Sequence, residues 1–85
     1  MRVKTDRRVG KFKIDLDLLD FHPEVVKDLT ERMVITRAEA LWHSMKIEYY
    51  AVSDLFDEVP VWENAPEYIL SCDMAGNVTA ERVIQ

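Results

Sequence analysis

A strict alternation of apolar and charged residues begins at Lys11 and constrains the fold more than any other feature. Phe12, Ile14, Leu16 and Leu18 alternate with Lys11, Lys13, Asp15 and Asp17. Successive side chains of a β-strand point to opposite faces, so this pattern predicts a half-buried strand over residues 12–19. We expect the strand to end near residues 20–23, because Pro23 suits the first turn of a helix.

Three further patterns predict the elements that follow. After Pro23, apolar residues recur at helical spacing, which predicts a helix from Pro23 to about Arg32. Asp28 and Arg32 stand four apart in the acid-first order that stabilises helices. Near the C-terminus, alternating residues 68–72 and 78–84 flank a turn at 74–77 and predict a β-hairpin. Residues 59–62 contain Pro60 and fit only a short edge strand.

Residues 34–53 fit two structures. Thr36 and Glu39 match the capping box of a helix over 37–48. Alternation from Val34 to Trp42 instead favours a hairpin that turns at 43–46 and returns over 47–53. Periodicity alone does not decide between them, and both remain open. Either way, the predicted class is α+β: a small antiparallel β-sheet of about 4–5 strands with one or two helices packed on one face.

Charge divides the chain into two parts. Residues 1–13 hold six basic side chains and one acidic one, whereas residues 14–85 hold five basic and fifteen acidic ones. We therefore predict a basic N-terminal arm over residues 1–10, followed by a single α+β domain over 11–85, because 85 residues seldom form two cores. An acidic body repels phosphate, so only the arm is suited to nucleic acid or to the acidic body of a second copy.

The residue types that carry chemistry are sparse. Cys72 is the only cysteine and is predicted to pack in the core, so no disulfide or zinc motif is expected. Asp20 and His22, two apart at the end of the predicted strand, could ligate a metal or act as an acid–base pair, but positions at the entrance of the following helix explain both. His43 with Ser44 lacks the third group that orients a catalytic base. We expect no enzyme activity, no metal and no cofactor. The N-terminus has no apolar stretch typical of a signal peptide, so we expect a cytoplasmic protein with no membrane partner.

The segment from Ser53 to Pro66 is predicted to be an acidic loop. Together with one or two surface aromatics, its carboxylates are suited to a basic groove on a protein partner. The candidate partner-binding residues of this loop are Asp54, Phe56, Asp57, Glu58, Trp62 and Glu63. The aromatic residues considered are Trp42, Tyr49, Tyr50, Phe56 and Trp62, which are more than one side of so small a core easily holds.

The order and spacing of the elements resemble the uracil-DNA glycosylase inhibitor family of phages, whose members are small acidic α+β proteins that mimic DNA. The likeness is carried by strand 12–19, by the helix that begins Pro23-Glu24-Val25-Val26, by Ala65-Pro66-Glu67-Tyr68 and by the hairpin that turns at 73–77. The resemblance implies that Asp17, with Leu18 and Leu19, enters a partner's DNA-binding cleft. The family's Glu-Ser-Ile triplet reads Asp17-Leu18-Leu19 here, and a basic arm replaces its N-terminal helix.

We therefore predict a small acidic protein for protein–protein interaction, without enzyme activity. It would be an inhibitor or regulator of the phage type, acting against host defences or as a DNA mimic, and would dock on a basic protein surface as a monomer or homodimer. The alternative is a structural or assembly subunit that self-associates through its sheet, for which the strand over 78–84 offers an exposed edge.

Overall fold

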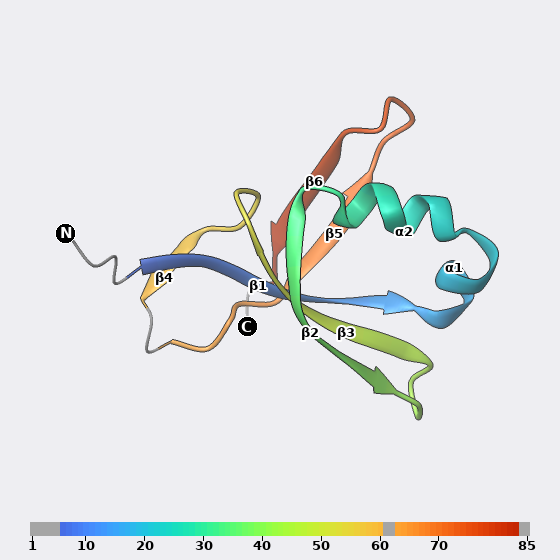
Figure 1. Ribbon diagram of the computed structural model, residues 1–85, viewed down its shortest axis with the longest axis horizontal. Helices are drawn as coiled ribbons and strands as arrows, with labels where there is room; N and C mark the ends of the chain where they lie inside the picture. The colour runs from blue at the N-terminus through green and yellow to red at the C-terminus, as the bar shows by residue number, and fades with distance from the viewer. Residues whose placement is uncertain (1–5, 61–62, 84–85) are drawn as a thin grey trace.

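Four strands form an antiparallel sheet in the computed structural model, which describes residues 6–60 and 63–83. They are β1 (Asp6–Asp15), β2 (Met33–Leu41), β3 (Lys46–Ser53) and β4 (Glu58–Pro60). Their order is β2-β3-β1-β4, so β2 and β4 are the two edges (Figure 1). Two short helices and a separate two-stranded sheet complete the molecule, which confirms the predicted α+β class.

β1 begins earlier and ends earlier than the alternation predicted. Residues 6–8 pair with β4, so residues 6–10, assigned above to the basic arm, belong to the sheet; residues 1–5 lie outside the described part of the chain. The strand ends at Asp15 because its neighbour β3 begins at Lys46, directly opposite. Leu16 then donates its N–H to the Met45 carbonyl (3.0 Å), and the chain turns away.

Residues 16–19, predicted to continue the strand, are helical. Helix α1 (Leu16–Phe21) is followed after His22 by α2 (Pro23–Thr30). Pro23 opens α2 as expected, and Val26 and Leu29 bury one face of it. The α2 prediction is confirmed, but the predicted pair of Asp28 with Arg32 does not form, because the helix ends before Arg32.

The ambiguous segment forms the hairpin of β2 and β3. β3 lies between β2 and β1, with Tyr49 opposite Phe12 and Ile47 opposite Ile14, so pairing with β1 decides in favour of the strand. The capping-box residues take other roles. Thr36 lies at a β-bulge, where its hydroxyl donates to the Tyr50 carbonyl (3.1 Å), while Glu39 contacts Arg37.

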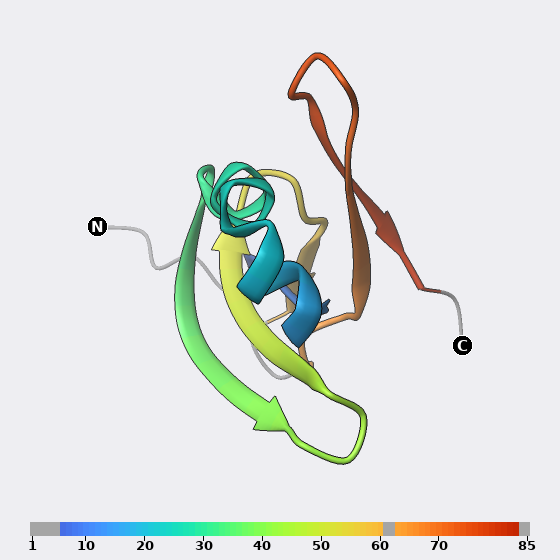
Figure 2. The ribbon, with the colours of Figure 1, turned by 90° about the vertical axis from the view of Figure 1, so that its right-hand side faces the viewer.

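The second sheet is the predicted C-terminal hairpin, β5 (Tyr68–Cys72) and β6 (Val78–Arg82). It is joined to β1 at its base, where Lys11 donates its N–H to the Pro66 carbonyl (2.8 Å). From there the hairpin diverges from the larger sheet and packs against α2. In the view of Figure 2 it lies on the other side of the helices from β2.

The core lies where these layers meet. It is built by one cluster of buried residues: Phe12, Ile14, Val26, Ala51, Phe56 and Tyr68. The Phe56 and Tyr68 rings are 4.6 Å apart and cover Gly10 of β1, the one position on that face with no side chain. The core therefore ties the acidic loop and the C-terminal hairpin to the central strand. Among the described helices, neither is long and apolar enough to cross a membrane.

Candidate functional site

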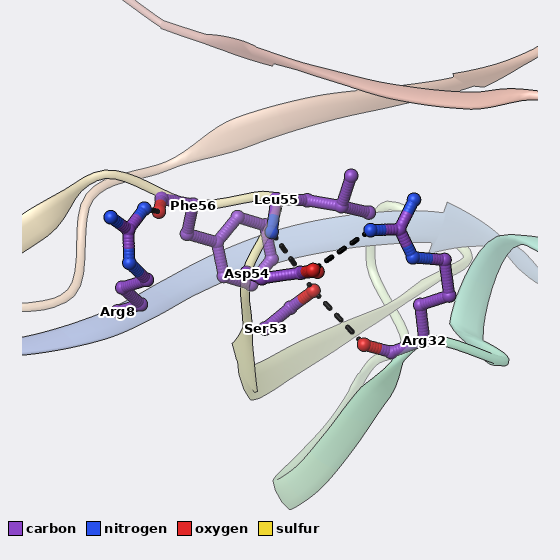
Figure 3. Close-up of polar contacts among 6 residues, drawn as sticks. All are labelled: Arg8, Arg32, Ser53, Asp54, Leu55 and Phe56. Atoms are coloured by element: carbon purple, nitrogen blue, oxygen red, sulfur yellow. Dashed lines mark hydrogen bonds and ion pairs between the residues drawn. The ribbon is translucent and has the colours of Figure 1, made fainter.

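The acidic loop is anchored by Ser53, the last residue of β3, which is only 5% exposed. Its hydroxyl donates to the Arg32 carbonyl (3.1 Å) and accepts the Leu55 N–H (3.2 Å), as Figure 3 shows. On the other side, Arg8 of β1 donates to the Phe56 carbonyl (2.9 Å). These contacts at Ser53 and Phe56 fix the backbone of the first part of the loop and give its carboxylates defined positions.

Asp54 and Asp57 of the loop, and Glu58 at the start of β4, each lie beside an arginine. Asp54 contacts Arg32 at 2.8 Å (Figure 3), while the Asp57–Arg82 and Glu58–Arg8 distances are 3.8 and 3.9 Å. These pairs are partly exposed, so each contributes little to stability. Their consequence is electrostatic: a basic partner must compete with guanidinium groups that already lie beside these carboxylates.

The remaining candidate residues of the loop occupy different environments. Phe56 is 1% exposed, so its ring belongs to the core and does not form part of a partner-binding surface. Trp62 lies outside the described residues. Glu63 is exposed, and its carbonyl accepts a hydrogen bond from Arg7 (3.0 Å). Of the surplus aromatics, Trp42 reaches the surface at 70% exposure, in the turn between β2 and β3.

Asp17 and Leu18, the candidates implied by the family resemblance, lie on α1 and not on a strand. Asp17 is exposed in the first turn of the helix. Leu18 is half-buried and, with Leu19, packs against the core. The helical phase thus separates the triplet, leaving Asp17 available to a partner and using both leucines for packing.

The helices carry an acidic surface that was not predicted from the sequence. Residues 16–31 contain five carboxylates and one basic side chain, Lys27. We call this set, together with Phe21, the acidic helical surface: Asp17, Asp20, Phe21, Glu24, Asp28 and Glu31, all exposed. Glu24 contacts the His22 imidazole (3.4 Å), but within the described residues no other carboxylate of the set forms an ion pair.

Phe21 lies within this surface and is 74% exposed. It follows Asp17 and Asp20 by four residues and one residue, and therefore shares the outward side of α1 while Leu18 and Leu19 pack inward. A large exposed aromatic side chain among carboxylates combines an apolar anchor with a charged surround. Phe21 could have been identified by placing residues 16–21 on a helix, where it lies on the same side as Asp17, but residues 16–19 were predicted to form a strand.

Two described groups have displaced pKa values. Burial raises the pKa of the Tyr50 phenol, and its hydrogen bond to the Glu48 carboxylate (3.2 Å) acts in the same direction. Hydrogen bonds from the backbone and side chain of Asn77 lower the pKa of Asp73 in the β5–β6 turn. Within residues 6–60 and 63–83, no group of three His, Cys, Asp or Glu is arranged to hold a metal ion.

The residues weighed above for catalysis or metal binding are solvent-exposed. Asp20 and His22 lie at the end of α1 and in the link to α2, and His43 and Ser44 lie in the β2–β3 turn. The Ser44 hydroxyl donates to the Leu41 carbonyl (3.2 Å), the contact of a turn residue.

No protein-family model, curated protein or solved structure matches the chain.

Proposed function

We propose that this protein is a non-enzymatic binding module that docks its acidic helical surface on a basic surface of a partner protein. The observation that carries the proposal is the exposed ring of Phe21 beside Asp17 and Asp20, neither of which has an ion-pair partner within the described residues. Such carboxylates attract a basic partner over a distance, and an aromatic side chain that becomes buried on contact supplies most of the affinity.

The positions of the carboxylates add support. Asp20 lies in the last turn of α1, Asp28 lies near the end of α2, and Glu31 is its C-terminal cap. The C-terminal end of a helix favours cations, so acidic residues there cost stability. A sequence that keeps three carboxylates at such positions is better explained by an intermolecular role than by stability.

The proposed partner is of the type predicted from the sequence, a protein with a basic surface, but the proposed contact residues differ from the predicted ones. Asp17 remains a contact residue, whereas Asp54, Asp57 and Glu58 are secondary because arginines already lie beside them. A basic groove that accepts an acidic surface is commonly one that binds nucleic acid. The protein would then act as an inhibitor that competes with nucleic acid, in the manner of a phage-encoded DNA mimic.

The test compares two sets of amide variants. The immobilised protein is exposed to those proteins of a bacterial lysate that bind phosphocellulose, and retained proteins are released by a salt gradient. The triple variant D20N/D28N/E31Q should capture less of the partner and release it at lower salt. The matched loop variant D54N/D57N/E58Q should equal the wild type in both the amount captured and the salt concentration of release. Equal behaviour of the two triple variants would refute the assignment to the helices.

Phe21 provides a second, charge-independent test. Phe21→Ala should weaken capture about thirtyfold or more, as expected for a hot spot, with little change in the salt dependence. Trp42→Ala is the matched control, because Trp42 is similarly exposed but lies in the β2–β3 turn, outside the acidic helical surface. An unchanged affinity for Phe21→Ala would remove the anchor from the proposal.

A further inference from the structure

β2 is an open edge. It pairs with β3 on one side, and in the sheet order β2-β3-β1-β4 no described strand follows it on the other. Between its two end residues every side chain is exposed on both faces, and Figures 1 and 2 show the β2–β3 ribbon extending past the helices. An edge strand with unpaired backbone groups is a template for pairing with another chain.

Exposed apolar side chains gather on the same ribbon. Of eight large hydrophobic side chains that are exposed among the described residues, five belong to β2, β3 or the turn between them. They are Val34 (66%), Ile35, Trp42 (70%), Met45 and Val52. Concentration of apolar surface beside an open edge marks an interaction site more strongly than the same residues scattered singly.

The backbone groups that face the open edge follow from the pairing of the inner strands. Lys11 donates its backbone N–H to Pro66, on the side of β1 that faces away from β3. The backbone N–H and C=O of the next residue of β1 therefore point toward β3, and the same alternation then fixes the direction of these groups in β3 and β2. In this register the backbone N–H and C=O groups of Glu48 and Glu39 point toward each other. Ala38 and Ala40 therefore direct their N–H and C=O groups outward from the sheet.

We propose that β2 pairs antiparallel with β2 of a second copy, about a two-fold axis at Ala38. A two-fold axis perpendicular to the sheet keeps the two faces, so it must lie midway between the two copies of one residue of β2, which then face each other. An axis at Ala38 places Arg37 opposite Glu39 of the second copy, twice. An axis at Arg37 or at Glu39 instead places that residue opposite its own copy, so like charges would meet.

The local geometry fits this register. Arg37 and Glu39 are on one face of β2, since their side chains already contact each other at 3.3 Å, and both are exposed. Ala38 adds no bulk at the axis. The inference is independent of the acidic helical surface, because none of these residues lies on α1 or α2.

Charge reversal followed by mixing tests the register. Sedimentation equilibrium of the full chain should show a reversible dimer, and R37E or E39R alone should weaken dimerisation about thirtyfold, because two complementary pairs become two repulsive ones. An equimolar mixture of the two variants should restore the dimer, since each pair across the axis would again join a glutamate to an arginine. No intramolecular effect can produce rescue on mixing, so rescue reports on contact between copies.

Disulfide trapping provides the second measurement, in a Cys72→Ser background. Across the proposed axis the two Ala38 Cα atoms would be about 5.5 Å apart, within disulfide range, so Ala38→Cys should cross-link with itself on mild oxidation. Ala40→Cys is the matched control, because its two copies would be offset by four residues, roughly 13 Å. A wild-type protein that stays monomeric up to millimolar concentration, a dimer indifferent to both reversals, no rescue on mixing, or equal cross-linking at both positions would overturn the proposal.

Discussion

Gly10 is the position where one added methyl group most directly tests the packing of this core. A Cβ at Gly10 would lie 2.8 Å from Cδ1 of Tyr68 and 3.0 Å from both Cδ atoms of Phe56. These rings are 3% and 1% exposed and contact each other, so neither can move aside at low cost. Gly10→Ala should therefore destabilise the protein by overpacking.

The magnitude follows from two opposing effects. The backbone of Gly10 is not in the left-handed region, so alanine would restrict the unfolded chain and stabilise the fold by about 0.4–1 kcal/mol if space allowed. Overpacking of a filled core costs about 1–3 kcal/mol. We expect a net loss of about 1–2 kcal/mol, which urea denaturation followed by circular dichroism would show as a midpoint lower by roughly 1 M.

A double-mutant cycle separates the clash from other causes. Phe56→Val removes both Cδ atoms that would lie 3.0 Å from the new methyl group, so Gly10→Ala should cost less in that background, although Tyr68, with Cδ1 at 2.8 Å, still limits the space. Gly76→Ala is the control: Gly76 has a φ of 87° with no atom near the added Cβ, so its cost is backbone strain and is indifferent to Phe56. A Gly10→Ala protein as stable as the wild type would refute the reasoning.

Two further predictions concern the turns that hold the loop and the C-terminal hairpin. Ser53→Ala should cost about 1–3 kcal/mol in urea denaturation, because it removes the buried hydroxyl that serves the Arg32 carbonyl and the Leu55 N–H. A loss below about 0.5 kcal/mol, the size of an ordinary surface substitution, would contradict that role. The lowered pKa of Asp73 predicts a contribution to stability that is complete above its ordinary value of 3.8 and is lost as the pH falls through the lower folded value. NMR titration of the Asn77 amide should therefore show a midpoint below 3.8, and a midpoint at or above 3.8 would contradict the turn geometry.

The local patterns predicted those elements whose partners are close in sequence. α2 and the C-terminal hairpin were predicted correctly because a proline and a short turn define them locally. The end of β1 could not be predicted, because Leu16 and Leu18 continue the alternation while β3 offers no partner beyond Lys46. The capping box at Thr36 was likewise overridden by strand pairing, a contact between residues far apart in the sequence.

The candidate site was harder to predict because electrostatic partners are also distant. In the sequence Asp54 and Asp57 belong to an acidic run, yet their arginines come from the turn after α2 and from β6. On the helices the sequence offers a local partner that the structure does not use: Asp28 and Arg32 stand four apart, yet Arg32 contacts Asp54. Charge counts therefore identified an acidic protein but not which of its carboxylates are unpaired.

The two proposed surfaces respond to salt in opposite directions. Two copies that each carry a net charge of −5 repel each other over distances comparable to the Debye length, about 10 Å at 0.1 M salt, whereas Arg37 and Glu39 of opposing strands would be in direct contact. Added salt screens the long-range repulsion more than the contact pairs, so β2 pairing should strengthen up to moderate salt. Docking of the helices on a basic partner depends on long-range attraction and should weaken over the same range. A dimer that weakens with salt as steeply as partner binding does would show that one charged surface serves both associations, contrary to the separation of β2 from the acidic helical surface.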